Sequence, residues 1–140
     1  TALDVTVQAQ VMDLIKEIRT ELNSAIIMIT HDLGVVAGLC DRVLVMYGGR
    51  IVESGPVNDI FYNPQHPYTK CLLRAMPRLD EGRSDKLETI PGQPPNLQRL
   101  PQGCSFEPRC PDRIDICKTV RPDLLPISDA RMKACHLESI

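Results

Sequence analysis

Four cysteines gather near the end of this 140-residue chain, at Cys104, Cys110, Cys117 and Cys135. Four thiolates can hold a zinc ion or an iron–sulfur cluster. Zinc ribbons usually pair cysteines roughly two to four residues apart, and these four lie farther apart in the sequence. Spacing alone therefore leaves a cluster, zinc and paired disulfides open. No export signal is recognisable, so a metal or cluster is considered before disulfides.

His31 is the second candidate for chemistry. It directly follows the apolar run from Ala25 to Thr30, which predicts a strand. Ligands of open α/β sheets bind beyond the carboxyl ends of strands, and an imidazole there can donate a hydrogen bond to a phosphate oxygen. Taken alone, the residue is explained more simply as a loop histidine whose hydrogen bonds are satisfied.

The elements around His31 are predicted from hydrophobic periodicity. Apolar residues recur at helical spacing over residues 6–22, which indicates an amphipathic helix. The continuous β-rich run from Ala25 to Ile29 is typical of a strand covered on both faces. Asp32 is placed to cap a helix that reaches about Leu39. We therefore expect a helix, a strand and a short helix, in that order.

The next segment predicts a hairpin and two short helices. Strands at 42–47 and 50–53 flank Gly48-Gly49, and glycine tolerates the positive φ of a tight turn. Pro56 is expected to open a helix that ends before Asn63-Pro64. A further helix begins at His66-Pro67 and stops at Pro77. The order of elements fits the edge of an α/β layered domain.

Residues 78–103 are rich in proline, glycine and charge, which predicts a connector with little regular structure. The extension at 104–140 has no long apolar stripe, so cross-linking by a metal or cluster is a plausible source of its order. Two further cysteines, Cys40 and Cys71, are interpreted as small buried hydrophobes. His136 is interpreted as a bystander beside Cys135.

Composition excludes some classes of function. The net charge is -2 and aromatic residues make up 4% of the chain, without tryptophan. This composition disfavours nucleic acid as a partner. No apolar run approaches the roughly 20 residues that span a bilayer. The abrupt start at Thr1 leads us to expect a piece of a larger soluble protein.

Several motifs, in one fixed order, carry a family resemblance. They are Ala2-Leu3-Asp4, Ile29-Thr30-His31-Asp32, the stretch from Asp41 to Gly55, Asn63-Pro64-Gln65-His66-Pro67-Tyr68-Thr69, and the cysteine-bearing tail from Gly103 to Leu137. Ile29-Thr30-His31-Asp32 resembles the switch histidine motif of ABC ATPases. Together the motifs resemble the C-terminal half of the ATP-binding subunits of oligopeptide/dipeptide ABC importers, over essentially the whole chain.

The resemblance implies a fold and specific residue roles. Residues 1–77 would be the C-terminal part of a P-loop-type ABC ATPase domain, followed by the connector at 78–103 and a cluster- or metal-stabilised extension at 104–140. His31 would contact the γ-phosphate of ATP. Asp4 would face a second ATPase subunit, although a helix N-cap also explains an aspartate there. The cysteines would hold a 4Fe–4S cluster in a structural role, with zinc as the alternative.

The resemblance also implies partners and a reaction. The intact protein would use ATP and magnesium to drive peptide import at the cytoplasmic face of the inner membrane. It would work with a second ATPase subunit, with transmembrane permease subunits and indirectly with a substrate-binding protein. Relatives of the group also import metals and other small solutes, so the substrate stays open.

Motifs that are missing bear on catalysis. The chain has no Gly-x-x-x-x-Gly-Lys-Ser/Thr loop, no Ser-Gly-Gly signature and no magnesium-binding Asp with an adjacent catalytic Glu. Without the phosphate loop, nucleotide phosphates lose their backbone cradle, so we expect no ATP hydrolysis by these residues alone. The alternative interpretation is a non-catalytic iron–sulfur or zinc module that senses redox state or docks a partner.

Overall fold

The computed structural model describes residues 5–76 and 89–140, which form two compact units that divide between Asp41 and Arg42. The first unit contains α1 (Val5–Leu22) and α2 (Leu33–Leu39), both predicted from the sequence. Asp32 caps α2 as predicted, because its carboxylate accepts the backbone N–H groups of Gly34 and Val35. In the described part of the chain, no helix combines the length and apolar character needed to cross a membrane.

The strand predicted at residues 25–29 does not form. Residues 24–30 belong to no helix or strand, and no described strand pairs with them. Ile27 and Ile29 are 91% and 94% exposed. A strand with apolar side chains on both faces is stable only when neighbouring strands and covering layers enclose it. The described residues supply neither, so the prediction was wrong for this structure.

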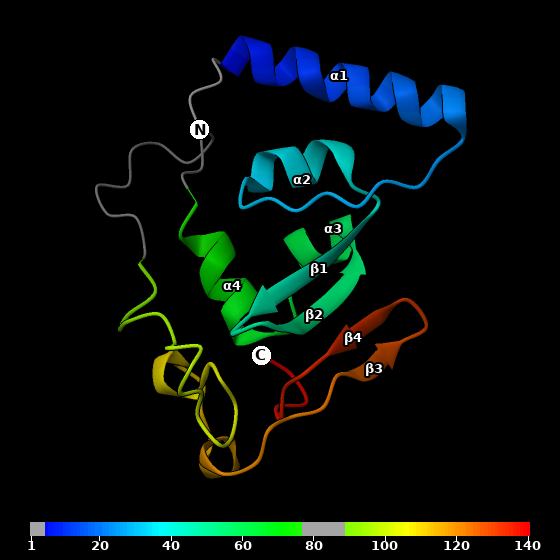
Figure 1. Ribbon diagram of the computed structural model, residues 1–140. Helices are drawn as coiled ribbons and strands as arrows, with labels where there is room; N and C mark the ends of the chain where they lie inside the picture. The colour runs from blue at the N-terminus through cyan, green and yellow to red at the C-terminus, as the bar shows by residue number, and fades with distance from the viewer. Residues whose placement is uncertain (1–4, 77–88) are drawn as a thin grey trace. The chain divides into compact units, whose positions relative to one another are not determined.

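The second unit is built on a four-stranded antiparallel sheet with the strand order β1-β2-β4-β3 (Figure 1). Its strands are β1 (Arg42–Tyr47), β2 (Arg50–Pro56), β3 (Leu125–Ser128) and β4 (Arg131–Lys133). Its helices are α3 (Val57–Tyr62), α4 (Pro67–Arg74) and the short 3₁₀ helices η1 (Glu107–Arg109) and η2 (Asp115–Lys118). The unit is thus a small α/β assembly with an antiparallel sheet.

The β1–β2 hairpin confirms the sequence prediction. Its turn residues Gly48 and Gly49 have φ values of 58° and 76°, the left-handed conformation that favours glycine. The helices that the sequence placed after the hairpin also form, as α3 and α4. The residue predicted to stop the second of them, Pro77, lies outside the described residues, and α4 ends at Arg74. Residues 89–103 contain no helix or strand, as predicted for the connector.

Residues of the C-terminal extension add strands to the hairpin's sheet, which the sequence did not predict. Glu53 and Ser54 of β2 pair with Lys133 and Met132 of β4, and the Ala134 N–H donates to the Val52 carbonyl at 2.8 Å. Backbone hydrogen bonds between β2 and β4 therefore hold this part of the extension in place without a metal.

An aromatic core joins the same segments. Phe106, from the extension, is 1% exposed and packs against Tyr47 and Tyr68 with ring centroids 5.1 and 5.3 Å away. Ile60 of α3 completes the buried cluster with valines of the hairpin. Edge-to-face aromatic pairs contribute about 0.5–1.5 kcal/mol each beyond the area they bury. The hairpin, the two following helices and the extension thus share one core.

Candidate functional site

His31 lies on an exposed segment directly before the cap of α2. The Asp32 N–H donates to the Thr30 hydroxyl at 3.0 Å, which fixes the backbone on either side of the histidine. The Asp32 carboxylate accepts a hydrogen bond from the Gln8 side chain at 2.9 Å. This hydrogen bond and the Val35 N–H hold the pKa of Asp32 below its usual value. His31 itself is exposed to solvent.

Asp4, the second residue assigned to the nucleotide site, lies outside the described residues. Its role at a subunit interface stays a prediction.

The four clustered cysteines do converge in space. Cys104, Cys110, Cys117 and Cys135 all line one small, mainly apolar pocket, together with His66 and Phe106. Cys104 and Cys135, which are 31 positions apart in the sequence, therefore line the same pocket. The sequence spacing could not show this convergence, because it depends on the folding of three separate loops.

Short backbone contacts bring these loops together. The Cys104 N–H donates to the Cys117 carbonyl at 2.8 Å, η1 carries the chain on to Cys110, and Cys117 lies within η2. Cys135 lies two residues beyond the end of β4. Gly103 makes the closest approach, because a Cβ there would overlap the Cys117 carbonyl oxygen and lie 2.7 Å from the Lys118 carbonyl carbon. Glycine is therefore required at this crossing.

Backbone N–H groups are directed at three of the four thiols. Cys104 is approached by the N–H groups of Phe106 and Glu107, and Cys110 by that of Asp112. Cys135 is approached by those of Leu137 and His136. Donors of this kind stabilise sulfur that carries negative charge.

Burial acts in the opposite direction on the same thiols. It raises the pKa of Cys104 and Cys135, and it raises the pKa of Cys110 to about 12. In each case desolvation is the main cause, and the neighbouring cysteines add to it. Without a cation nearby, the thiols are therefore neutral at physiological pH.

The geometry does not show the metal site that the sequence led us to expect. Among the described residues, no group of three or more His, Cys, Asp or Glu side chains is arranged to hold a metal ion. All six cysteines are free thiols, so the alternative of paired disulfides is not seen either. The four thiols surround a common pocket but are not gathered at ligating positions.

His66 is a site residue that sequence reasoning did not assign to chemistry. The sequence correctly predicted that it begins α4, where its Nδ1 accepts the Tyr68 N–H at 3.1 Å. The ring is 1% exposed, and its Nε2 has no hydrogen-bond partner. Burial, with a contribution from the Lys133 charge, lowers the pKa of His66 to about 4. The ring is therefore neutral at physiological pH. His136, interpreted as a bystander, directs its Nε2 at the Val120 carbonyl at 2.9 Å.

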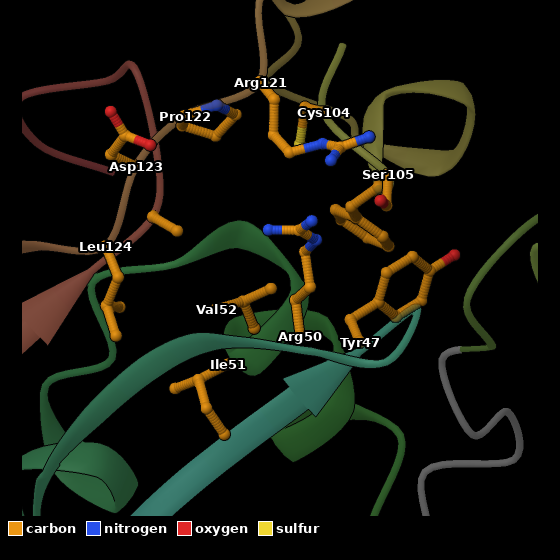
Figure 2. Close-up of a pocket in the computed structure, with 12 residues that line it drawn as sticks. Tyr47, Arg50, Ile51, Val52, Cys104, Ser105, Arg121, Pro122, Asp123 and Leu124 are labelled. Atoms are coloured by element: carbon orange, nitrogen blue, oxygen red, sulfur yellow. The ribbon is translucent and has the colours of Figure 1, made fainter. Parts of the chain in front are cut away.

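A larger pocket of about 250 Å³ lies between the hairpin and the extension (Figure 2). The side chains of Arg50 and Arg121 extend into it from opposite sides, above an apolar wall that includes Val52. Cys104 lines both this pocket and the cysteine pocket. The loop that carries Cys104 and Phe106 therefore lies between the two pockets.

Comparison with known protein families finds a match to part of the chain. Residues 52–117 match the family described as the oligopeptide/dipeptide transporter, C-terminal region. The matched segment runs from β2 through α4 to Cys117, and it includes three of the four clustered cysteines.

The chain is 60% identical over 135 residues to the oligopeptide transport ATP-binding protein OppD of Salmonella typhimurium, covering 96% of this chain and 40% of that protein. It is 54% identical over 139 residues to OppD of Haemophilus influenzae, covering 99% and 42%. A putative peptide import ATP-binding protein of Brucella ovis is 49% identical over 140 residues, covering 96% and 41%.

The chain is thus similar to the ATP-binding subunits of oligopeptide transporters, and its residues 52–117 match the C-terminal region of that family, in agreement with the resemblance found in the sequence. It spans about two fifths of the length of these relatives. Nothing in the comparisons favours the alternative of a non-catalytic iron–sulfur or zinc module.

Proposed function

We propose that this chain is the C-terminal part of an ATP-binding subunit that powers the import of oligopeptides. The observation that carries the proposal is the match over 96% of the chain to a named oligopeptide transport ATP-binding protein. In the intact subunit, the missing strands of a P-loop-type sheet would enclose residues 25–29. Their exposed isoleucines, Ile27 and Ile29, support this role because they require a covering layer.

His31 would act on the nucleotide. In such a sheet it would stand at the end of a central strand, with its backbone held by the Thr30 and Asp32 contacts. From there a ring nitrogen can donate to the γ-phosphate of ATP, which would be bound with magnesium. Phosphoryl transfer is catalysed mainly by positioning and charge stabilisation, so a single well-placed donor matters. Asp4 would face a second ATPase subunit.

The subunit would work on the cytoplasmic side of the inner membrane. Its partners would be transmembrane permease subunits, and a substrate-binding protein would deliver the peptide. Peptide is proposed as the substrate because the relatives' names specify it, and import of metals or other small solutes is the competing outcome.

The test is ATP turnover and peptide uptake by the intact subunit assembled with its permease. His31→Ala should lower ATP turnover by about 100-fold, the usual cost of removing one preorganised donor. Lys16→Ala, which removes only an exposed ion pair with Asp13 on α1, serves as the matched control. Normal turnover in His31→Ala would contradict the assigned role. Turnover without uptake of any oligopeptide would contradict the substrate.

The cysteine pocket is proposed to hold a 4Fe–4S cluster, with zinc as the alternative. The donor chemistry supports this, because four thiols line one pocket and backbone N–H groups are directed at three of them. The residues that would hold the cluster are Cys104, Cys110, Cys117 and Cys135. A bound cluster would supply the positive charge that keeps the buried thiolates ionised, and it would cross-link their loops.

Analysis of anaerobically purified subunit tests this second part. Iron and acid-labile sulfide in near-equal amounts support the cluster, whereas zinc without sulfide supports the alternative. Cys110→Ser and Cys117→Ser should lose the bound metal, while Cys40→Ser, in the first unit, should keep it. Retention of metal by Cys110→Ser would exclude that residue as a ligand.

A further inference from the structure

The larger pocket of the second unit contains two arginines whose charges are not paired. Arg50 enters it from the start of β2 and Arg121 from the loop before β3, so that their guanidinium groups extend into the pocket from opposite sides (Figure 2). Among residues 5–76 and 89–140, neither side chain makes a hydrogen bond or an ion pair. The N–H donors of both groups are therefore available to a ligand. We call this hollow the arginine pocket.

The charge of the arginine pocket selects for a singly charged anion. One carboxylate, that of Asp123, also lines it, and no ion pair within the described part of the chain joins Asp123 to either arginine. Two positive charges and one negative charge leave the lining with a net charge of +1. Two guanidinium groups that face one pocket repel each other, and an anion between them would offset that repulsion. A single negative charge matches this lining better than the double charge of a phosphate group.

The rest of the lining is mainly apolar. Val52 and Ala134 are buried, and Leu124 and Phe106 line the same pocket. Ser105 adds a hydroxyl group that makes no hydrogen bond among the residues described. The volume of about 250 Å³ is below the roughly 300–1,000 Å³ of sites for drug-sized molecules. The pocket therefore suits a small ligand with one charged end and one apolar end.

We propose that the arginine pocket binds a small organic monocarboxylate that carries a short apolar group. The carboxylate lies between Arg50 and Arg121, because the planar fork of a guanidinium matches the two oxygens of a carboxylate. The apolar group packs against Val52 and Leu124. Since the two arginines belong to the hairpin and to the extension, the bound carboxylate links these two segments. The inference requires neither a nucleotide nor a metal, so it stands independently of the proposed function.

Three probe molecules test the two halves of this chemistry by calorimetric titration of the intact subunit. N-acetyl-leucine has both the carboxylate and an apolar group, N-acetyl-leucinamide has the same shape without the charge, and N-acetylglycine has the charge without the apolar group. Hydrogen bonds to charged groups and the burial of a leucine side chain each correspond to about a 10-fold change in affinity. N-acetyl-leucine should therefore bind about 10-fold more tightly than either of the other two probes.

Substitutions locate the binding site. Arg50→Gln and Arg121→Gln should each weaken the binding of N-acetyl-leucine by about 10-fold, because each removes a charged donor. Arg99→Gln is the matched control, since Arg99 is also exposed but does not line the pocket, and it should keep the wild-type affinity. Thermal unfolding of each variant establishes that the fold is kept.

Saturation-transfer NMR of the wild-type subunit provides a test that depends on no variant. The leucine methyl protons of N-acetyl-leucine should receive more saturation than its acetyl methyl protons, because the side chain packs against the apolar wall. Binding of N-acetyl-leucinamide or inorganic phosphate as tight as that of N-acetyl-leucine would overturn the proposed ligand class. Unchanged affinity in both Arg50→Gln and Arg121→Gln, or no detectable binding of N-acetyl-leucine, would overturn the site itself.

Discussion

The Glu53 carboxylate lies 3.2 Å from the guanidinium of Arg131, and the two residues are 78 positions apart in the sequence. Glu53 is 0% exposed and Arg131 8%. Glu53 also accepts the backbone N–H groups of Gln65 and His66, while Arg131 donates to the Asn63 carbonyl at 2.6 Å. One buried ion pair therefore fastens β2, the start of α4 and β4 to one another.

Breaking this pair should destabilise the second unit strongly. Arg131→Met leaves the Glu53 charge buried without its partner, and such changes cost about 3–5 kcal/mol. The double variant Glu53→Gln with Arg131→Met should recover part of the loss, because no lone charge remains. Equilibrium unfolding in urea, followed as a double-mutant cycle, measures both effects. A single-variant loss below about 0.5 kcal/mol would mean that the pair is solvated rather than buried.

Gly103→Ala should disturb the cysteine pocket. The added methyl group would overlap the Cys117 carbonyl oxygen, so the loops that carry Cys104 and Cys117 must separate. We expect a loss of about 2 kcal/mol in stability, within the range for overpacking, together with reduced metal content. Gly38→Ala on α2 is the matched control, because a Cβ there meets nothing within 4 Å and alanine favours the helix. Metal analysis and thermal unfolding compare the two variants, and equal behaviour would contradict the close crossing.

Stability should fall in mild acid through His66. Because its pKa is lowered to about 4 from 6.5, the folded state favours the neutral ring, and the unfolded chain binds more protons between these values. The contribution is complete above pH 6.5 and is lost as the pH falls toward 4. For a shift of this size it amounts to about 3 kcal/mol.

The slope of the unfolding free energy against pH isolates this effect. Between pH 6.5 and 4 the metal-free wild-type protein should lose more stability than His66→Asn, and above pH 7 the two curves should run parallel. Identical slopes in the acid range would show that the ring is not desolvated.

Cys110 should react slowly with alkylating reagents in the reduced, metal-free protein. Burial raises its pKa to about 12, so little thiolate is present at pH 8, and the thiolate is the reactive form. The labelling rate should continue to rise with pH beyond 9 instead of levelling off as for a free cysteine. Mass spectrometry of alkylated peptides measures the rate, with urea-unfolded protein as the reference. Equal rates in folded and unfolded protein would contradict the burial.

Local signals in the sequence were sufficient for the four α-helices and the hairpin, although not for the short 3₁₀ helices η1 and η2. The Asp32 cap, the Gly48-Gly49 turn and the His66-Pro67 helix start each depend on residues next to one another. The pairing of β4 with β2 and the Glu53–Arg131 contact connect distant segments, and no local pattern reveals them. The strand at 25–29 failed for a related reason, because its stability depends on neighbours that the described residues do not include.

The cysteines show the same division between local and distant information. Their number and residue type indicated shared chemistry, but their convergence depends on the Gly103 crossing and on the position of β4. His66 was recognised only as a helix start, since nothing in its neighbours reveals that its second nitrogen is buried without a partner.

The placement of β4 beside β2 also bears on self-association. Without β4, the backbone groups of β2 that now meet Lys133 and Ala134 would be open to strand addition by another molecule. With β4 in place, the sheet ends on this side at β3, which is only four residues long and contains Pro126. Shortness and proline both discourage further strand pairing. A chain truncated before residue 125 should therefore aggregate through β2 even if its cysteine loops were unchanged.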